Sequence, residues 1–322
     1  MVAPVGSRLV STLIIGAAGM IGRKLAAELA GQDLILHDVV PFAGASAVSD
    51  LSAPGEAEKL VASRPELIFH LAAVVSGEAE ADFEKGYRVN LDGTRRLFEA
   101  IRKQRYRPRV VFTSSIAVFG APFPEAIGDE FLNAPLTSYG TQKAIGELLL
   151  SDYSRRGFFD GIGIRLPTVC VRPGKPNKAA SGFFSGIIRE PLNGEEAVLP
   201  VPETVRHWFA SPRAAIGFLL HASRINTETL GTRRNLSMPG VSATVGEQIE
   251  ALRKVAGEKA VRLIRRAPDP TIQRIVEGWP RNFDARRALG LGFRADESFE
   301  QIIRIHIADE LEKTPSPRAG FA

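Results

Sequence analysis

The chain has 322 residues, of which 44% are hydrophobic and 24% are charged, and its formal net charge is +5 at pH 7. This length and apolar content predict a globular protein with a substantial core. The excess positive charge comes from scattered arginines rather than from a basic block, so we expect no nucleic-acid partner.

The sequence also lacks the signals of a secreted, membrane or metal-binding protein. It contains no run of about 18 apolar residues, and its amino-terminal stretch lacks the pattern of a signal peptide. The single cysteine, Cys170, excludes an intrachain disulfide and a multi-thiolate site, and none of the five histidines falls at zinc-ligand spacing. We therefore predict a cytoplasmic protein with no membrane contact and no metal.

Short apolar runs alternate with helical patterns through the first half of the chain. The runs are rich in Val, Ile, Leu and Phe, which is typical of strands buried on both faces. They lie at 9–17, 33–40, 66–75, 109–115 and 161–169. The helical patterns lie at about 19–30, 55–63, 79–105 and 138–156. This alternation predicts an α/β fold with a Rossmann-type, doubly wound parallel sheet.

The pattern becomes irregular after about residue 168, where proline and glycine interrupt it. A helical segment at 211–223 and the strand-like RNLSM indicate that the chain then returns to the first part. We predict a first domain made of 1–168 plus about 211–238. The remaining segments, about 169–210 plus 239–322, are expected to form a smaller, irregular second domain.

A glycine-rich turn, GAAGMIG, follows the first predicted strand and opens a helix. Its glycines, Gly16, Gly19 and Gly22, allow a sharp turn and close approach of the backbone to a diphosphate, whose charge the helix amino terminus stabilises. The spacing is GxxGxxG rather than GxGxxG. A purely structural turn is the alternative, but the order of strand, turn and helix favours a dinucleotide.

An acidic residue, Asp38, ends the second predicted strand, sixteen positions after Gly22. An acid at this place binds the adenosine ribose hydroxyls and disfavours a ribose phosphate, so the expected cofactor is NAD. The first domain is therefore predicted to bind NAD and the second to bind the substrate. Arg23 keeps NADP as an alternative because it follows the glycines directly. Asp50 and Leu51 are candidates to flank the adenine.

A tyrosine and a lysine, Tyr139 and Lys143, stand four positions apart on a predicted helix and therefore share a face. An ammonium about 4–6 Å from the phenol favours the phenolate by roughly 3–4 kcal/mol at a dielectric of about 20. We expect this attraction to bring the pKa of Tyr139 toward 7, which makes the phenol a usable general base. Ser115, at the end of the fourth predicted strand, is placed to hold the substrate oxygen.

These motifs together resemble the extended short-chain dehydrogenase/reductases, which include NAD-dependent epimerases and dehydratases. The resemblance is carried by GAAGMIG, HLAA at 70–73, NLDGT at 90–94, TSSIAVFG at 113–120, YGTQK at 139–143 and RLPTVCVRPG at 165–174. It implies that Ser115 polarises the substrate oxygen, that Tyr139 accepts the proton and that Lys143 is its electrostatic partner. Phe119 stands where the family motif has Tyr, outside the catalytic set.

The resemblance also implies a set of contacts to the dinucleotide. Asn90 matches a family position and is expected to shape its helix rather than to take part in chemistry. The expected cofactor-binding residues are Gly16, Gly19, Met20, Ile21, Gly22, Asp38, Asp50, Leu51, Leu71, Ala72, Ala73, Asn90, Tyr139, Lys143 and Pro167.

Longer stretches, among them HLAAVVSGEAEADFEKGYRVNLDGT and IREPLNG, are similar to one branch of this family. Its members oxidise the C2 hydroxyl of a four-carbon sugar acid with NAD. We therefore expect a small anionic sugar acid as substrate. The segment RLPTVCVRPGKPN also lacks the Asn that meets the substrate in nucleotide-sugar enzymes.

A sugar acid needs positive charge to hold its carboxylate. Arg206 stands where the wider family has an Arg that meets substrate phosphate, and a surface ion pair is the alternative for it. Arg172 and Lys175 are further candidates, while His207 is expected to be packed or solvated rather than a base. The expected substrate-binding residues are Ser76, Ser115, Tyr139, Arg172 and Arg206.

Two other functions stay open at this point. A nucleotide-sugar epimerase or dehydratase would keep NAD bound through a turnover with no net reduction. A non-catalytic dinucleotide sensor or scaffold is disfavoured by the complete Ser-Tyr-Lys set. Relatives often dimerise through two long helices, here near 79–105 and 138–156, so the resemblance implies a homodimer.

Overall fold

The computed structural model describes residues 10–174 and 180–312 of the chain. Within these ranges a seven-stranded sheet forms the base of the molecule, in the order β10-β6-β5-β4-β1-β2-β3 with every neighbouring pair parallel. The predicted α/β fold class, a doubly wound parallel sheet, is confirmed. The strands are β1 Thr12–Ile15, β2 Leu34–Asp38, β3 Ala47–Val48, β4 Leu67–His70, β5 Arg109–Ser115, β6 Asp160–Leu166 and β10 Asn235–Ser237.

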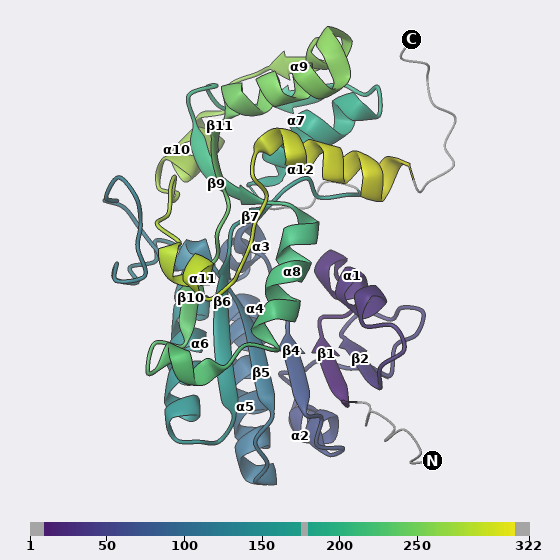
Figure 1. Ribbon diagram of the computed structural model, residues 1–322, viewed down its shortest axis with the longest axis vertical. Helices are drawn as coiled ribbons and strands as arrows, with labels where there is room; N and C mark the ends of the chain where they lie inside the picture. Colours follow the sequence, from purple (N-terminus) through teal and green to yellow (C-terminus); the bar gives the residue numbers. More distant parts are fainter. Residues whose placement is uncertain (1–9, 175–179, 313–322) are drawn as a thin grey trace, which may run out of the picture.

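Helices cover both faces of this sheet because successive strand residues point to opposite sides. Ile14 packs in one core with residues of α1 and α8, whereas Leu13 and Ile15 pack in another with residues of α2, α5 and α6. Figure 1 shows α8 crossing in front of the strands. These helices are α1 Met20–Glu28, α2 Glu56–Val61, α5 Gly93–Gln104, α6 Ser138–Arg155 and α8 Pro212–Ala222.

The single helix predicted over 79–105 is interrupted. It is divided into α3 (Ser76–Ala81), α4 (Phe83–Gly86), a π-helical segment (Tyr87–Asp92) and α5. Asp82 causes the first break, since its backbone is non-helical (φ −131°, ψ 86°) and its carboxylate accepts a hydrogen bond from the Lys85 N–H as the cap of α4. An aspartate that caps a new helix competes with continuation of the old one.

The strand predicted over 161–169 is divided as well. β6 ends at Leu166, and after Pro167 the chain enters β7 (Thr168–Val169), which pairs with β9 (Arg206–Ala210) in a separate three-stranded sheet that β11 (Val241–Thr244) completes. Proline has no N–H to donate to a strand ladder, which explains the change of sheet.

The second layer of structure lies beyond the carboxyl ends of the large sheet (Figure 1). It contains the three-stranded sheet and a core of its own around Phe184, Phe209 and Leu252. This core is separate from the two cores that flank the large sheet, and the division of the chain into two domains near residue 168 stays a prediction. The further elements of the second layer are α7 Gly182–Leu192, β8 Ala197–Leu199, α9 Val245–Val261, β12 Ile264–Arg266, α10 Pro270–Glu277 and α12 Phe299–His306. The short helix α11, Arg286–Gly290, instead packs beside β10 in a core of the large sheet.

No helix in residues 10–174 and 180–312 is both long and apolar enough to cross a membrane.

Candidate active site

The glycine turn lies between β1 and α1, and two of its glycines are required by close contacts. Gly16 has φ +93°, and a Cβ there would lie 2.6 Å from the Ala72 backbone nitrogen. A Cβ on Gly22 would lie 2.2 Å from the Gly16 carbonyl oxygen. The turn therefore packs against the end of β4, and α1 packs against the turn. This leaves the amino terminus of α1 open for a diphosphate, so the residues present fit a dinucleotide.

Asp38 completes the turn from the neighbouring strand. Its carboxylate accepts hydrogen bonds from the Ala18 N–H (2.9 Å) and the Val40 N–H (3.1 Å). Val39 and Val40 beyond it are exposed and carry no positive charge that would bind a ribose phosphate. The carboxylate next to the turn therefore fits the ribose hydroxyls of NAD.

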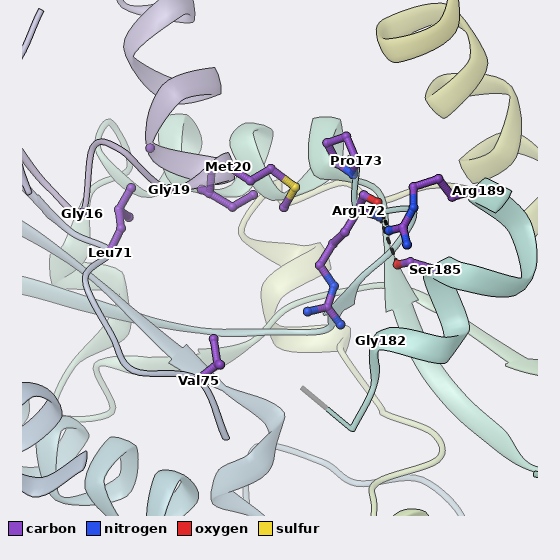
Figure 2. A pocket seen from close by; sticks show the side chains of 12 residues that line it. Gly16, Gly19, Met20, Leu71, Val75, Arg172, Pro173, Gly182, Ser185 and Arg189 are labelled. Carbon is purple, nitrogen blue, oxygen red and sulfur yellow. Dashed lines mark hydrogen bonds between the residues drawn. The ribbon is translucent and has the colours of Figure 1, made fainter. Parts of the chain in front are cut away.

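A cavity of about 320 Å³ extends from the glycine turn to α7. Figure 2 shows Arg172 reaching into the space between Met20 on one side and Ser185 on the other. Five predicted cofactor residues at the turn and Leu71 thus share one cavity with the predicted substrate residue Arg172. The cavity is lined by Gly16, Gly19, Met20, Ile21, Gly22, Leu71, Val75, Arg172, Pro173, Gly182, Ser185 and Arg189.

The three predicted catalytic side chains come from β5 and α6. Ser115 is the last residue of β5, and Tyr139 lies in the first turn of α6, which Thr137 caps by accepting a hydrogen bond from the Gly140 N–H (3.0 Å). The Lys143 Nζ lies 5.8 Å from the centre of the Tyr139 ring, so the two side chains share a face of the helix as their spacing predicts. The same ammonium donates a hydrogen bond to the Thr113 carbonyl oxygen (2.8 Å).

The acidity expected for Tyr139 is not observed, and the prediction that Lys143 alone brings its pKa toward 7 is wrong. Burial raises the pKa of Tyr139 to about 12, against the opposing effects of a hydrogen bond with Ser115 and the charge of Arg172. Burial also lowers the pKa of Lys143 to about 8. The loss of hydration disfavours the phenolate more than its surroundings stabilise it.

Three further predicted cofactor residues, Asn90, Asp50 and Leu51, take part in local contacts. Asn90 holds the loop after β4: its side chain accepts a hydrogen bond from the Val74 N–H (2.7 Å) and donates one to the Val74 carbonyl (3.0 Å). This contact agrees with a shaping role. Asp50 accepts hydrogen bonds from Ser52 and Arg88, and the buried Leu51 packs near Gly93.

Arg172 is held in the cavity through its main chain. Its N–H donates to the Ser185 Oγ (3.0 Å), and its carbonyl accepts from the Arg189 Nη1 (2.7 Å). Its guanidinium donates to the Ser181 Oγ (2.6 Å). No carboxylate among residues 10–174 and 180–312 forms an ion pair with Arg172, whereas Arg189 pairs with Glu190. The cavity therefore contains a guanidinium whose charge is not neutralised there.

Arg206 lies outside the residues that line the cavity. It begins β9, donates to the Ser242 carbonyl (3.2 Å) and forms an ion pair with Glu247 (3.2 Å), with 37% of its side chain exposed. Arg206 thus forms the surface ion pair that was the alternative to a substrate contact. Lys175, the third candidate, lies outside the described residues.

His207 is packed, as expected. Its Nδ1 lies 2.8 Å from the Pro280 carbonyl oxygen and its Nε2 lies 2.6 Å from the Thr168 Oγ1, while its ring stacks on Phe184. Burial lowers its pKa to about 4, so it is neutral at pH 7. A hydrogen on Nδ1 satisfies the carbonyl and leaves Nε2 to accept from the threonine.

Ser185 and Arg189 were not predicted from the sequence. They belong to the stretch GFFSGIIREPL of α7, which reads as an ordinary amphipathic helix. The segment IREPLNG, residues 188–194, resembles the family but gives no reason to select either side chain as functional.

A profile of the NAD dependent epimerase/dehydratase family matches residues 12–211, more than half of the chain. The chain belongs to this family. It is an NAD-dependent oxidoreductase of the extended short-chain dehydrogenase/reductase type, and its cofactor is NAD.

Three relatives cover nearly the whole chain. A D-erythronate dehydrogenase of Cupriavidus necator is 46% identical over 93% of this chain and 98% of its own length. A D-erythronate dehydrogenase of Haemophilus influenzae is 43% identical, covering 91% and 97% respectively. The crystal structure of a nucleoside-diphosphate-sugar epimerase from Agrobacterium tumefaciens is 65% identical and superposes with a TM-score of 0.90, covering 96% and 98%.

The close contact at Gly22 leads to a first prediction. In Gly22→Ala the new Cβ meets backbone atoms that no side-chain rotation can move, so the turn must open. We expect a cost of about 1–3 kcal/mol and a roughly 5- to 150-fold weaker NAD Kd, measured by calorimetry. Gly217→Ala in α8 is the matched control because a Cβ there meets nothing within 4 Å. Equal NAD affinity in both variants would contradict the packing argument.

Proposed function

We propose that this protein oxidises the C2 hydroxyl of a small sugar acid with NAD, with D-erythronate as the substrate and 2-dehydro-D-erythronate as the product. The observation that carries this proposal is the unneutralised guanidinium of Arg172 in the cavity next to the glycine turn, close enough to Tyr139 to oppose the rise of its pKa. The similarity to two D-erythronate dehydrogenases supports the choice of acid.

The position of Arg172 relative to Tyr139 suits a 2-hydroxy acid in particular. In such a substrate the carboxylate is bonded to the carbon that is oxidised, so its cationic partner must lie beside the catalytic base. A guanidinium matches a carboxylate with two parallel donors. Arg206 on β9 forms an ion pair with Glu247 on α9 and does not meet this requirement.

In the proposed reaction Tyr139, as the phenolate, accepts the proton of the C2 hydroxyl. In the free protein this form is scarce at pH 7, because the pKa of Tyr139 is about 12, and the charge of Arg172 favours it. With substrate bound, the Ser115 hydroxyl, which contacts Tyr139 in the free protein, donates to the substrate oxygen instead, and Lys143, 5.8 Å from the ring centre, adds its positive charge. NAD supplies the acceptor for the hydride that leaves C2, so the alcohol loses a proton and a hydride and becomes a ketone. The carboxylate held by Arg172 sets which hydroxyl faces the base.

A nucleotide-sugar epimerase is the second candidate, because the Agrobacterium tumefaciens protein, 65% identical to this chain, is described as one. Such an enzyme would return the hydride to the substrate within one turnover. Its product would be an epimer of the nucleotide sugar, with no accumulation of NADH.

An assay of purified enzyme separates the two functions. We expect NADH to accumulate with D-erythronate and to a lesser extent with other four- to six-carbon sugar acids, as followed by its absorbance. NADP should give a much lower rate, because Asp38 faces the ribose hydroxyls. Epimerised nucleotide sugar without net NADH, together with no reaction of any acid, would establish the second candidate instead.

The homodimer and the cytoplasmic location also stay predictions. Two large apolar side chains are exposed on the helices that are expected to form the dimer interface: Phe83 on α4 and Leu148 on α6. Their exposure supports an interface there. Sedimentation equilibrium of the wild-type chain and of Leu148→Glu measures this directly, with a monomeric variant as the expected result.

A further inference from the structure

A buried ion pair lies one helical turn beyond Lys143. Glu147 on α6 and Arg165 on β6 have side chains that are only 2% and 8% exposed. The Arg165 Nε donates to the Glu147 Oε1 (2.9 Å), and its Nη2 donates to the Oε2 (2.8 Å), so the pair is bidentate. Two desolvated charges are costly, and such pairs are weak evidence for stability alone.

The same carboxylate connects the helix to the strand that carries Ser115. Ser114, the residue before it on β5, donates its hydroxyl to the Glu147 Oε1 (2.6 Å). Asn133 donates to the Oε2 (3.0 Å). Each carboxylate oxygen therefore accepts two hydrogen bonds, and one side chain joins α6 to the carboxyl-terminal ends of β5 and β6.

We propose that Glu147 is a positioning residue for the reaction, because it clamps α6 to the end of β5 and so fixes Tyr139 and Lys143 relative to Ser115. This inference rests on the proposed Ser-Tyr-Lys function. The clamp acts at the ends of the strands where the cavity lies, and a displacement of about 1 Å in a catalytic group can cost about 100-fold in rate.

The charge of Glu147 also acts on Lys143. Burial lowers the pKa of Lys143, and Glu147 opposes this effect. Within the described residues the ammonium also faces the Thr113 carbonyl and the rings of Phe112 and Tyr139. His70 on β4 lies near enough to feel its charge, and burial lowers the pKa of His70 to about 3, so that it is neutral at pH 7. Loss of Glu147 lowers the pKa of Lys143 further, so the ammonium loses its proton at a lower pH.

The chain offers a matched control at the opposite end of the same two strands. Arg109 begins β5, Asp160 begins β6, and their side chains form an ion pair (2.7 Å) that is 19% and 22% exposed. This pair clamps the same strands away from the site. Its removal tests whether any loss of a clamp between these strands has the same effect on activity.

The test compares three double variants of the full chain. In Glu147→Leu with Arg165→Met, the bidentate ion pair is replaced by apolar side chains. Asp129, whose buried carboxylate lies 3.8 Å from the Arg165 Nη1, loses this cation as well, so we expect a lower melting temperature and use the variant only where it is folded. We expect NAD affinity near the wild-type value, kcat lower by about 10- to 100-fold, and the high-pH limb of the kcat profile displaced to lower pH by about one unit.

Glu147→Gln with Arg165→Met separates geometry from charge. The glutamine oxygen still accepts a hydrogen bond from Ser114, so we expect kcat to be higher than in Glu147→Leu with Arg165→Met. The displacement of the pH profile should be the same in both variants, because both lack the negative charge. Arg109→Met with Asp160→Leu should lower the melting temperature and leave both kcat and the pH profile as in the wild type.

Wild-type kcat and pH dependence in a folded Glu147→Leu, Arg165→Met variant would overturn the inference, and so would an equal change in the Arg109, Asp160 control. If the double variants fail to fold, Ser114→Ala tests the inference, because it removes only one hydroxyl. We expect kcat to fall about fivefold, the equivalent of one hydrogen bond. An unchanged kcat would reject the clamp. If these variants reject the role of Glu147 while Tyr139→Phe is inactive, only the positioning inference is wrong and the proposed function stands.

Discussion

Tyr139→Phe is expected to bind NAD about as well as the wild type while its kcat falls by about two to four orders of magnitude, the range for loss of a general base. The substitution removes only the phenol oxygen that we propose accepts the substrate proton. The ring, which lies 5.8 Å from the Lys143 Nζ, keeps its place on the helix. Stopped-flow and steady-state measurements of NADH formation, with NAD affinity from calorimetry, test this result.

Tyr106→Phe is the control for Tyr139→Phe. The Tyr106 hydroxyl is buried without a hydrogen-bond partner in the described part of the chain, and burial raises its pKa as it does for Tyr139. Its loss should change neither NAD affinity nor kcat. Near-full activity of Tyr139→Phe would remove this residue from the mechanism and would reject the proposed function with it.

The second large effect is expected at Arg172. In Arg172→Leu the sugar-acid carboxylate loses a charged hydrogen-bonding partner, which costs about 1.5–3 kcal/mol or roughly 10- to 150-fold in kcat/KM. The cavity wall should survive, because Ser185 and Arg189 hold the main chain of residue 172 rather than its guanidinium. The test is kcat/KM with D-erythronate and with its uncharged amide. We expect Arg172→Leu to lower kcat/KM for the acid and to leave kcat/KM for the amide unchanged.

Arg206→Leu distinguishes the two arginines that the sequence offers for this role. The ion pair of Arg206 with Glu247 is largely at the surface and contributes little, so we expect kcat/KM to stay within about twofold of the wild type. A large loss of kcat/KM in Arg206→Leu with no loss in Arg172→Leu would show that Arg206 binds the substrate carboxylate. The proposal for the cavity would then be wrong.

Much of the fold and part of the site follow from local pattern. Buried parallel strands read as short apolar runs. A Cβ would lie within 3 Å of the Ala72 backbone at Gly16 and of the turn's own backbone at Gly22, which is why glycine stands at both positions in the sequence. The shared face of Tyr139 and Lys143 is likewise a property of helical spacing alone. Each of these features depends on residues close together in the chain.

The features that only the tertiary structure decided join residues far apart in the chain or depend on burial. Arg172 and Arg206 look alike as sequence. The packing of α7 holds Arg172 beside the glycine turn, whereas the packing of β9 beside α9 puts Arg206 against Glu247. Glu147 gains its importance from Ser114 and Arg165 on two other elements. The pKa of Tyr139 rises because water is excluded from its surroundings, and hydration is set by the assembled core rather than by sequence neighbours.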